Sequence, residues 1–202
     1  INPREFCVYH FLDPHPRNPD AGMWVAVDKN GTKYVVDELY MKPQDTKDLA
    51  YRIKSKNSQY RIIARQIDPS AFIVDQHRNE SLATALVAEG LVYEPASKAR
   101  SAAVKRIETA LNYQEINGNM VRAPELYIFS TCPRTIWEFE HWRWDEWTGK
   151  TSETRSRKEK PIDKDDHMVE NLGRALIIEP MFVPWVPQST QSGAPEYDPY
   201  GR

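Results

Sequence analysis

The sequence predicts an α/β domain in which three antiparallel strands precede strands that alternate with helices. An apolar run at residues 6–12 opens the chain, and a hairpin sequence at residues 28–31 joins two further strands, at residues 23–27 and 33–41. Beyond residue 44, segments with apolar residues at helical spacing alternate with short apolar runs. This order predicts a mixed sheet of about five strands with helices packed on both faces.

Length and composition are those of one globular domain followed by a tail. The chain has 202 residues, of which 40% are hydrophobic and 28% are charged, and its net charge is -2. No apolar run is long enough to span a bilayer, so we expect no membrane partner. We place the domain at residues 1–179 and a proline-rich tail at residues 180–202. The chain starts without Met and without a signal segment, so we expect it to be part of a longer protein.

The first strand is predicted to end on a carboxylate. Residues 6–12 place apolar and aromatic side chains on both faces, which is the pattern of a strand covered on both sides. Pro14 and Pro16 have no N–H to donate to a ladder, so the strand must stop before them. Asp13 is therefore expected at the tip of the strand, at the edge of the sheet.

The later elements follow from caps, breakers and apolar stripes. Asp45 or Thr46 is suited to begin a helix, and Gly90 is suited to end one. A turn is predicted at residues 117–119. The closing helix carries an apolar stripe of Met168, Leu172, Ala175 and Leu176. Helices are predicted at residues 44–57, 82–88, 98–114, 133–142 and 163–178, and strands at residues 61–67, 91–93 and 126–129.

A second strand ends in the same way as the first. Residues 61–67 are halted by the pair Asp68-Pro69, which repeats the pair Asp13-Pro14. If the two strands are neighbours, their terminal carboxylates converge on one site. Taken singly, each Asp-Pro pair is also a common turn.

A third acidic position lies at the start of the closing helix. Asp165 and Asp166 follow Asp163 there, where the helix dipole favours negative charge, so they also fit the role of caps. Together with Asp13 and Asp68, they supply the oxygen-only ligands that Mg²⁺ and Mn²⁺ prefer. Two such ions about 4 Å apart are able to activate a water and to stabilise the leaving oxygen of a phosphodiester. No serine triad, phosphate-binding loop or cysteine nucleophile pattern competes with this interpretation.

Histidine, aromatic and basic residues near the acids have both a functional and a structural interpretation. His15 and His167 fit proton carriers or groups that orient the acids, and also a turn residue and a cap. The aromatic residues within 137–147 fit a base-stacking platform, although core packing is the better interpretation. Basic residues gather at 98–106 and 150–160, which predicts phosphate contacts. The candidate DNA-binding residues are Lys98, Arg100, Lys105, Arg155, Arg157 and Lys158.

Five short stretches occur in a characteristic order along the chain. They are Asp13-Pro14-His15-Pro16-Arg17, Val36-Asp37-Glu38-Leu39-Tyr40, Asp68-Pro69-Ser70-Ala71, Gly90 to Pro95-Ala96-Ser97-Lys98, and Lys164 to Asn171. In this order the chain resembles the ribonuclease H-like nucleases over most of residues 6–178. More narrowly, it resembles the C-terminal nuclease domain of tailed-phage large terminase subunits.

The resemblance implies a Mg²⁺- or Mn²⁺-dependent endonuclease with a two-ion site, which cuts concatemeric viral DNA into genome lengths. An ATPase motor domain would precede it in the full-length protein. Its partners would be double-stranded DNA, the portal and the small terminase subunit. It would act in the host bacterial cytoplasm, at the procapsid portal, and the tail would be a candidate for portal docking.

The resemblance also implies a set of site residues. The catalytic and metal-binding acids would be Asp13, Asp68, Asp165 and Asp166, with Asp20 as an auxiliary metal ligand. In the closing helix, the Asp-Ala and Arg-Tyr pairs of the family are replaced by Glu170-Asn171 and Gly173-Arg174-Ala175. This departure leaves open whether Glu170 contacts metal, and which of Asp165 and Asp166 is the main ligand.

Two other functions are compatible with the sequence. A ribonuclease H-like resolvase or integrase-type enzyme would use the same acids and would prefer branched substrates. A non-catalytic DNA- or portal-docking module would keep the acids only as turns and caps.

Overall fold

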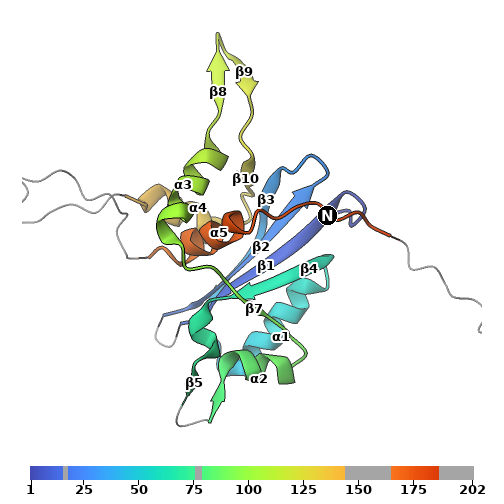
Figure 1. Ribbon diagram of the computed structural model, residues 1–202, viewed down its shortest axis with the longest axis vertical. Helices are drawn as coiled ribbons and strands as arrows, with labels where there is room; N and C mark the ends of the chain where they lie inside the picture. Colours follow the sequence, from blue (N-terminus) through green and yellow to red (C-terminus); the bar gives the residue numbers. More distant parts are fainter. Residues whose placement is uncertain (16–17, 76–78, 144–164, 187–202) are drawn as a thin grey trace, which may run out of the picture.

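In the computed structural model, which describes residues 1–15, 18–75, 79–143 and 165–186, a mixed six-stranded sheet lies between layers of helices (Figure 1). The strand order is β10-β3-β2-β1-β4-β7. These strands are β1 (Phe6–Asp13), β2 (Asp20–Asp28), β3 (Lys33–Met41), β4 (Ile62–Ile67), β7 (Glu94–Pro95) and β10 (Leu126–Ile128). The predicted α/β class with a mixed sheet is confirmed, with six strands where about five were expected.

Strand β1 organises the sheet. It pairs antiparallel with β2 and parallel with β4, and β2 pairs antiparallel with β3. Because β1 and β4 are parallel neighbours, with Leu12 opposite Ile67, both strands end at the same edge of the sheet. The N–H of Asp68 donates to the carbonyl of Leu12 at 3.0 Å. Asp13 and Asp68 therefore follow adjacent strand ends.

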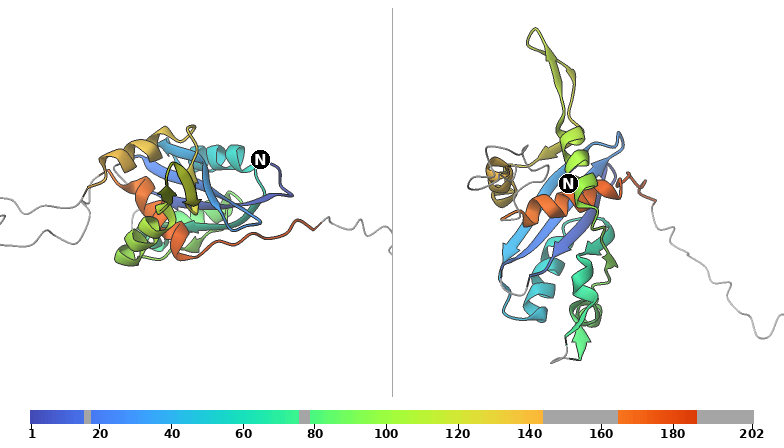
Figure 2. Two further views of the ribbon diagram at one scale, coloured as in Figure 1. Left: turned by 90° about the horizontal axis from the view of Figure 1, so that it is seen from above. Right: turned by 60° about the vertical axis from the view of Figure 1, so that its left-hand side comes forward.

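Helices cover both faces of the sheet, as predicted. The helices of the described residues are α1 (Thr46–Asn57), α2 (Leu82–Ala88), α3 (Arg100–Leu111), α4 (Pro133–His141) and α5 (His167–Ile177). α1 and α2 lie on one face, and α3 and α5 lie on the other (Figures 1 and 2). None of these helices is both long and apolar enough to cross a bilayer.

Each face of the sheet has its own hydrophobic core. Leu12 of β1 belongs to the core that contains Ile53 of α1, whereas Phe11 belongs to the core that contains Leu172 of α5. Successive residues of a strand point to opposite faces, so β1 contributes to both cores. This double burial explains why residues 6–12 are apolar on both faces.

Helix ends agree with the sequence where a side chain or a glycine defines them. Asp45 accepts a hydrogen bond from the N–H of Asp48 (2.9 Å) at the start of α1. Ser81 accepts one from the N–H of Thr84 (3.1 Å) at the start of α2. Gly90, with φ +78°, follows the end of α2.

The strand predicted at residues 91–93 is wrong. Leu91 and Tyr93 are buried in the core on the α1 side, but the pairing with β4 forms at Glu94 and Pro95. The apolar run marked burial and not strand pairing, and a short apolar run does not distinguish the two. The segment before it contains a 3₁₀ helix, η1 (Pro69–Phe72), and a short two-stranded ladder of β5 (Val74–Asp75) and β6 (Glu80–Ser81).

The helix predicted at residues 98–114 is shorter than expected, because Gln114 begins a hairpin. Strand β8 (Gln114–Ile116) pairs with β9 (Asn119–Arg122) around the predicted turn, and the hairpin extends away from the domain (Figure 1). Every residue of both strands is exposed. No alternation between a buried and an exposed face therefore signals this hairpin in the sequence.

The closing helix begins later than predicted. Asp166 is the N-cap residue of α5, and Asp165 before it has a left-handed φ of +52°, which a helix cannot include. Asp163 lies outside the described residues. The predicted apolar stripe of α5 is buried: Met168, Leu172, Ala175 and Leu176.

Close contact between α3 and α5 depends on Gly173. A Cβ atom added to Gly173 would lie 2.7 Å from the Cβ of Ala103, which is too short for any side chain. The absence of a side chain at this position therefore lets α5 approach α3. This contact places α3 next to the helix that carries Asp166.

The aromatic residues near α4 have mixed environments. Phe139 and Trp142 pack against the core on the α5 side, as the core interpretation predicts. Trp137 is 38% exposed and stacks on His141, with ring centroids 4.3 Å apart. Trp144 and Trp147 lie outside the described residues.

The segment after α5 lies along the start of β1 and β4. The Met181 carbonyl accepts hydrogen bonds from Tyr9 Oη (2.8 Å) and Cys7 Sγ (3.4 Å). Arg61 donates to the carbonyl of Val183. The beginning of the predicted tail is therefore in contact with the sheet, and residues 187–202 lie outside the described residues.

His10 is a fully buried titratable group of β1. Its ring stacks on Trp24 (centroids 4.2 Å apart), and its Nδ1 is hydrogen-bonded to Tyr93 Oη at 3.0 Å. Its Nε2 has no hydrogen-bond partner among the described residues. Burial, helped by the charge of Arg65, lowers the pKa of His10 from 6.5 to about 3.

Acidification is therefore expected to destabilise the fold through His10. Its folded-state pKa is depressed, so its contribution to stability is fully present above pH 6.5 and is lost as the pH falls toward 3. The loss approaches about 1.4 kcal/mol per pH unit for one proton. In urea titrations, His10→Asn, which cannot be protonated, is expected to lose less unfolding free energy than the wild type between pH 6.5 and 4. Equal pH slopes in the two proteins would contradict this.

Candidate active site

Arg174 of α5 joins the two acids at the strand ends. Its guanidinium donates from Nη1 to Asp13 Oδ1 (2.9 Å) and from Nη2 to Asp68 Oδ2 (2.6 Å). The three side chains are only 10–11% exposed. One buried guanidinium therefore holds both carboxylates, and the structure brings Asp13 and Asp68 together.

Helix α5 adds further acids to this group. Glu170, one turn before Arg174, accepts a hydrogen bond from Nη2 (3.3 Å) and pairs with Nη1 of Arg100 (3.1 Å). Arg100 of α3 also donates to Asp166. Arg100 thus connects Asp166 to Glu170, which in turn contacts Arg174. We call these residues the Arg174 cluster: Asp13, Asp68, Arg100, Asp166, Glu170 and Arg174.

Asp20 lies next to Asp13 at the start of β2. Its neighbour Ala21 is opposite Asp13 in the ladder, and its Oδ1 accepts a hydrogen bond from the N–H of His15 (2.9 Å). Burial raises the pKa of Asp20 to about 6; the hydrogen bond from His15 opposes this rise, and the charge of Asp13 adds to it. Asp13 and Asp20 therefore repel each other when both are ionised.

Asp165 is placed differently from Asp166. Its side chain is 49% exposed, and its Oδ1 lies 3.7 Å from Nη2 of Arg134 on α4. Asp166 is buried and accepts a hydrogen bond from Arg100, which is also a member of the Arg174 cluster. Of the two neighbouring acids, Asp166 is thus the one that contacts Arg100 and belongs to the Arg174 cluster.

His167 contacts Asp13 directly. Its Nδ1 lies 2.9 Å from Asp13 Oδ2, and its Nε2 lies 3.3 Å from Nδ2 of Asn18. The hydrogen bond with Asp13 is the main reason that the pKa of His167 is raised. The ring of His15 is 5.5 Å from that of His167, and its Nδ1 accepts a hydrogen bond from the N–H of Asn18 (2.9 Å).

Asp68 is held in its ionised form. Burial by itself would raise the pKa of this carboxyl group, but hydrogen bonds from Ser70 and the charges of Arg174 and Lys98 lower it below its usual value. The N–H of Ser70 donates to Oδ1 at 2.7 Å, and Nζ of Lys98 lies 3.7 Å from the same oxygen. Glu170 behaves in the opposite way, because burial raises its pKa.

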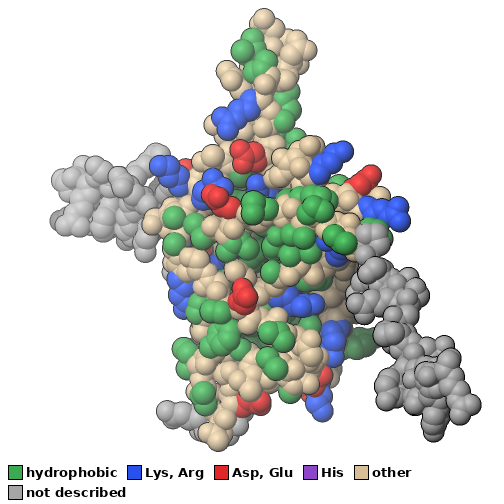
Figure 3. Space-filling view, turned by 45° about the vertical axis from the view of Figure 1, so that its right-hand side comes forward, with side chains coloured by type: hydrophobic (Ala, Val, Ile, Leu, Met, Phe, Trp, Pro, Cys, Tyr) green, Lys and Arg blue, Asp and Glu red, His purple; other side chains and the backbone are tan. Residues whose placement is uncertain are grey.

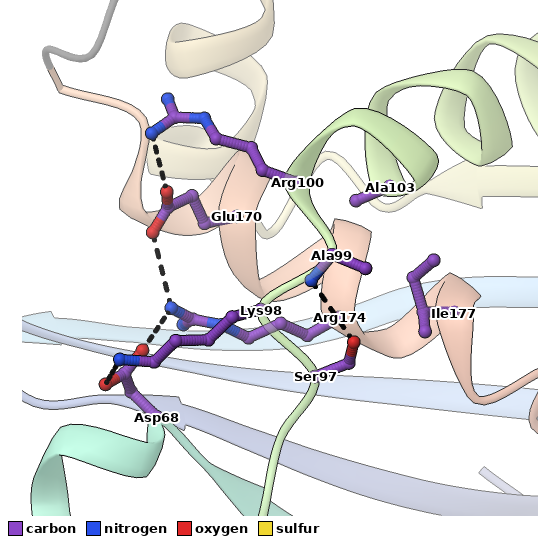
Figure 4. Close-up of a pocket in the computed structure, with 9 residues that line it drawn as sticks. All are labelled: Asp68, Ser97, Lys98, Ala99, Arg100, Ala103, Glu170, Arg174 and Ile177. Carbon is purple, nitrogen blue, oxygen red and sulfur yellow. Dashed lines mark hydrogen bonds and ion pairs between the residues drawn. The ribbon is translucent and has the colours of Figure 1, made fainter.

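A cleft of about 250 Å³ opens beside Arg174 (Figure 4). Its charged lining consists of Asp68, Lys98, Arg100, Glu170 and Arg174, and Ala103 and Ile177 are among its apolar residues. The side chain of Lys98 is 63% exposed. The cleft therefore presents cationic groups beside the acids, which suits an approaching phosphate.

The predicted DNA-binding residues are only partly gathered by the fold. Lys98 and Arg100 line the cleft, and Lys105 is exposed on α3. Arg155, Arg157 and Lys158 lie outside the described residues. Acidic and basic side chains are interspersed over the face seen in Figure 3, so no single basic patch dominates it.

Sequence reasoning missed two acids that accept hydrogen bonds from the N-terminal ends of α4 and α5. Glu138 of α4 is 1% exposed and accepts hydrogen bonds from the N–H groups of Met168 (2.7 Å) and Val169 (3.2 Å) at the start of α5. Glu38 of β3 does the same for α4, accepting from the N–H groups of Arg134 and Thr135 at 2.8 Å. Each helix start is thus satisfied by a carboxylate from another element.

The role of Arg174 was also missed, although the sequence held a signal for it. The apolar stripe of α5 surrounds this position, and a charged residue among buried ones requires a partner of opposite charge. The partners come from β1 and from the end of β4, which local sequence does not reveal.

The chemistry of the candidate ligands suits a hard divalent ion. Asp13, Asp20, Asp68 and Asp166 offer only carboxylate oxygens, which are the ligands that Mg²⁺ and Mn²⁺ prefer. Among the described residues, no three acidic, histidine or cysteine side chains already form a metal-ligand group. In this arrangement Arg174 takes one oxygen of Asp13 and one of Asp68.

Comparison with known proteins shows likeness at the level of structure. No protein-family model matches the sequence, and neither does any curated protein. The nuclease domain of the P22 large terminase aligns with a TM-score of 0.63 and 14% identity, over 88% of this chain and 84% of that one. The Mn-bound nuclease domain of the large terminase from bacteriophage SPP1 aligns with a TM-score of 0.57 and 19% identity, over 86% and 87%.

A longer large terminase, from a thermophilic bacteriophage, is also similar. It aligns with a TM-score of 0.64 and 19% identity, over 88% of this chain and 41% of that one. The chain thus spans about two fifths of the length of the thermophilic phage protein. From the sheet order, the helices on both faces and these neighbours, the chain has the ribonuclease H-like fold of the large terminase nuclease domains.

Proposed function

We propose that this chain is the metal-dependent endonuclease domain of a terminase large subunit, and that it cuts concatemeric double-stranded DNA during viral genome packaging. The observation that carries the proposal is the pairing of Asp13 and Asp68, from two adjacent parallel strands, on one buried guanidinium. Both carboxylates are thus within hydrogen-bond distance of the same side chain. The shared fold with the P22 and SPP1 nuclease domains supports the same reaction class.

In this proposal, aspartates of the Arg174 cluster and two aspartates outside it hold two ions of Mg²⁺ or Mn²⁺. Asp13, Asp68 and Asp166 are the main ligands, with Asp165 and Asp20 as auxiliary acids. When bound, such an ion pair supplies an activated water and stabilises the leaving oxygen of the phosphodiester. The protein contributes the placement: the strand ends fix Asp13 and Asp68, and the start of α5 fixes Asp166.

The surrounding residues have supporting roles. His167 orients the Asp13 carboxylate through its hydrogen bond at 2.9 Å and is positioned to exchange a proton with it. Lys98 and Arg100 line the cleft beside the acids, where they contact the phosphates of the bound strand. Charge complementarity with the DNA backbone is thus local to the cleft, although the chain as a whole has a net charge of -2.

The larger assembly belongs to the same proposal. An ATPase motor domain precedes this chain in the full-length protein, which accords with the two-fifths coverage of the thermophilic phage large terminase. The portal and the small terminase subunit are the further partners, in the bacterial cytoplasm at the procapsid portal. Residues 1–179 form the nuclease domain, and residues 180–202 form a tail that docks on the portal.

Cleavage of long linear double-stranded DNA tests the proposal. We expect the purified chain to shorten this DNA with Mg²⁺ or Mn²⁺, and to be inactive with a chelator. A four-way junction of matched length serves as the second substrate. Preference for the junction would favour a resolvase, and binding without cleavage under every metal condition would favour a docking module.

A further inference from the structure

Arg174 is an unusual neighbour for a predicted cation site. It is 9% exposed, and its guanidinium contacts four groups: Asp13 Oδ1 (2.9 Å), Asp68 Oδ2 (2.6 Å), Glu170 Oε2 (3.3 Å) and Asn171 Oδ1 (3.3 Å). Figure 4 shows its guanidinium between Asp68 and Glu170. Asp13 and Asp68, which are proposed to bind the metal ions, are thus already paired with the positive charge of Arg174.

We propose that Arg174 is a built-in counter-ion that competes with the divalent ions for Asp13 and Asp68. This inference rests on the proposed function, because it concerns the same acids. Buried carboxylates without a counter-charge are costly, and a guanidinium that bridges two of them offsets this cost in the metal-free protein. It also holds both acids through one side chain.

Competition follows from the contacts. An oxygen that accepts a charge-assisted hydrogen bond from Arg174 must give up or weaken this bond before it coordinates a cation fully. Asp13 and Asp68 each commit one oxygen in this way. Their other oxygens are held by His167 and Ser70, so neither acid is left without a donor. Binding of cations therefore carries the added cost of displacing the guanidinium.

Space for this displacement exists beside the cluster. Arg174 lines the cleft of about 250 Å³, together with the exposed Lys98. Glu170, whose second oxygen is paired with Arg100, remains within reach of the guanidinium. Arg174 is consequently a positioning residue that sets the metal concentration at which the site fills.

The test measures Mn²⁺ affinity directly, by electron paramagnetic resonance of free Mn²⁺ in titrations of the whole chain. Arg174→Met keeps an unbranched stem and removes the guanidinium with its charge. We expect it to bind Mn²⁺ about tenfold more tightly than the wild type, which is the scale of one charge-assisted hydrogen bond. Arg174→Lys keeps the charge and is expected to stay nearer to the wild type.

Two controls separate this effect from others. Arg106→Met removes one positive charge from α3, where Arg106 pairs with Glu179 at 3.1 Å, and is expected to leave the Mn²⁺ affinity unchanged. The double variant Asp13→Asn with Arg174→Met is expected to lose the tight binding. Equal or weaker binding by Arg174→Met, with binding that still depends on Asp13, overturns the competition and leaves the proposed nuclease standing. Failure of every variant and of the wild type to bind Mn²⁺ overturns the proposed function and this inference with it.

A second measurement uses the wild type alone, should Arg174→Met not fold. The nuclear magnetic resonance signal of the Arg174 Nε–Hε group reports on the contacts of the guanidinium. We expect this signal to shift and to exchange faster with solvent as Mg²⁺ is added. A signal that is unchanged at saturating Mg²⁺ overturns the proposed competition.

Discussion

Replacing Asp13 with Asn is expected to lower metal-dependent DNA cleavage by about a thousandfold or more, which is the scale of losing a charged group that acts on the transition state. Asn has nearly the same shape as Asp but lacks the charge that a divalent ion requires. Asp13 also contacts both Arg174 (2.9 Å) and His167 (2.9 Å), so its charge acts on two neighbours at the site. Asp68→Asn is expected to have a similar effect.

The cleavage rate on linear DNA in Mn²⁺ and the thermal unfolding midpoint are measured together. Glu108→Gln is the matched control, because Glu108 is an exposed acid on α3, and it is expected to keep the wild-type rate. A rate for Asp13→Asn within about tenfold of the wild type would remove Asp13 from the catalytic machinery. A folded Asp13→Asn protein with no activity would support the proposed role.

Replacing Glu138 with Ala is expected to destabilise the fold by about 3 kcal/mol, which is typical when a buried charge network loses one partner. Glu138 is 1% exposed, and three donors depend on it: the N–H groups of Met168 and Val169, and Nε of Arg134 at 2.9 Å. The start of α5 would lose its acceptor, and α5 carries Arg174. We therefore expect cleavage activity to fall together with stability.

Urea unfolding measures this effect, and α4 offers a close control. Glu140 lies two residues from Glu138 on the same helix and is exposed, so Glu140→Ala is expected to change stability by no more than about 0.5 kcal/mol. A loss below about 1 kcal/mol for Glu138→Ala would mean that water satisfies the start of α5 in place of the carboxylate.

Much of the fold was predictable because local signals agree with it. β3 was predicted with its observed bounds, and α2 likewise, since hairpin sequences, caps and glycines act over a few residues. The hairpin of β8 and β9 was missed because both of its strands are exposed. The strand at residues 91–93 was wrong because its apolar residues are buried without pairing.

The sequence by itself determined where the chain turns and which carboxylates stand at the strand ends, since two prolines that cannot donate hydrogen bonds follow Asp13 and Asp68 directly. Only the tertiary structure decided that these ends are adjacent, that Asp166 and not Asp165 contacts Arg100, and that Arg174 contacts both Asp13 and Asp68. The physical reason is the separation along the chain over which each interaction acts. Strand breaks and caps depend on neighbours in sequence, whereas Arg174 meets Asp13 and Asp68 across 161 and 106 residues, at a position set by how α5 packs on the sheet.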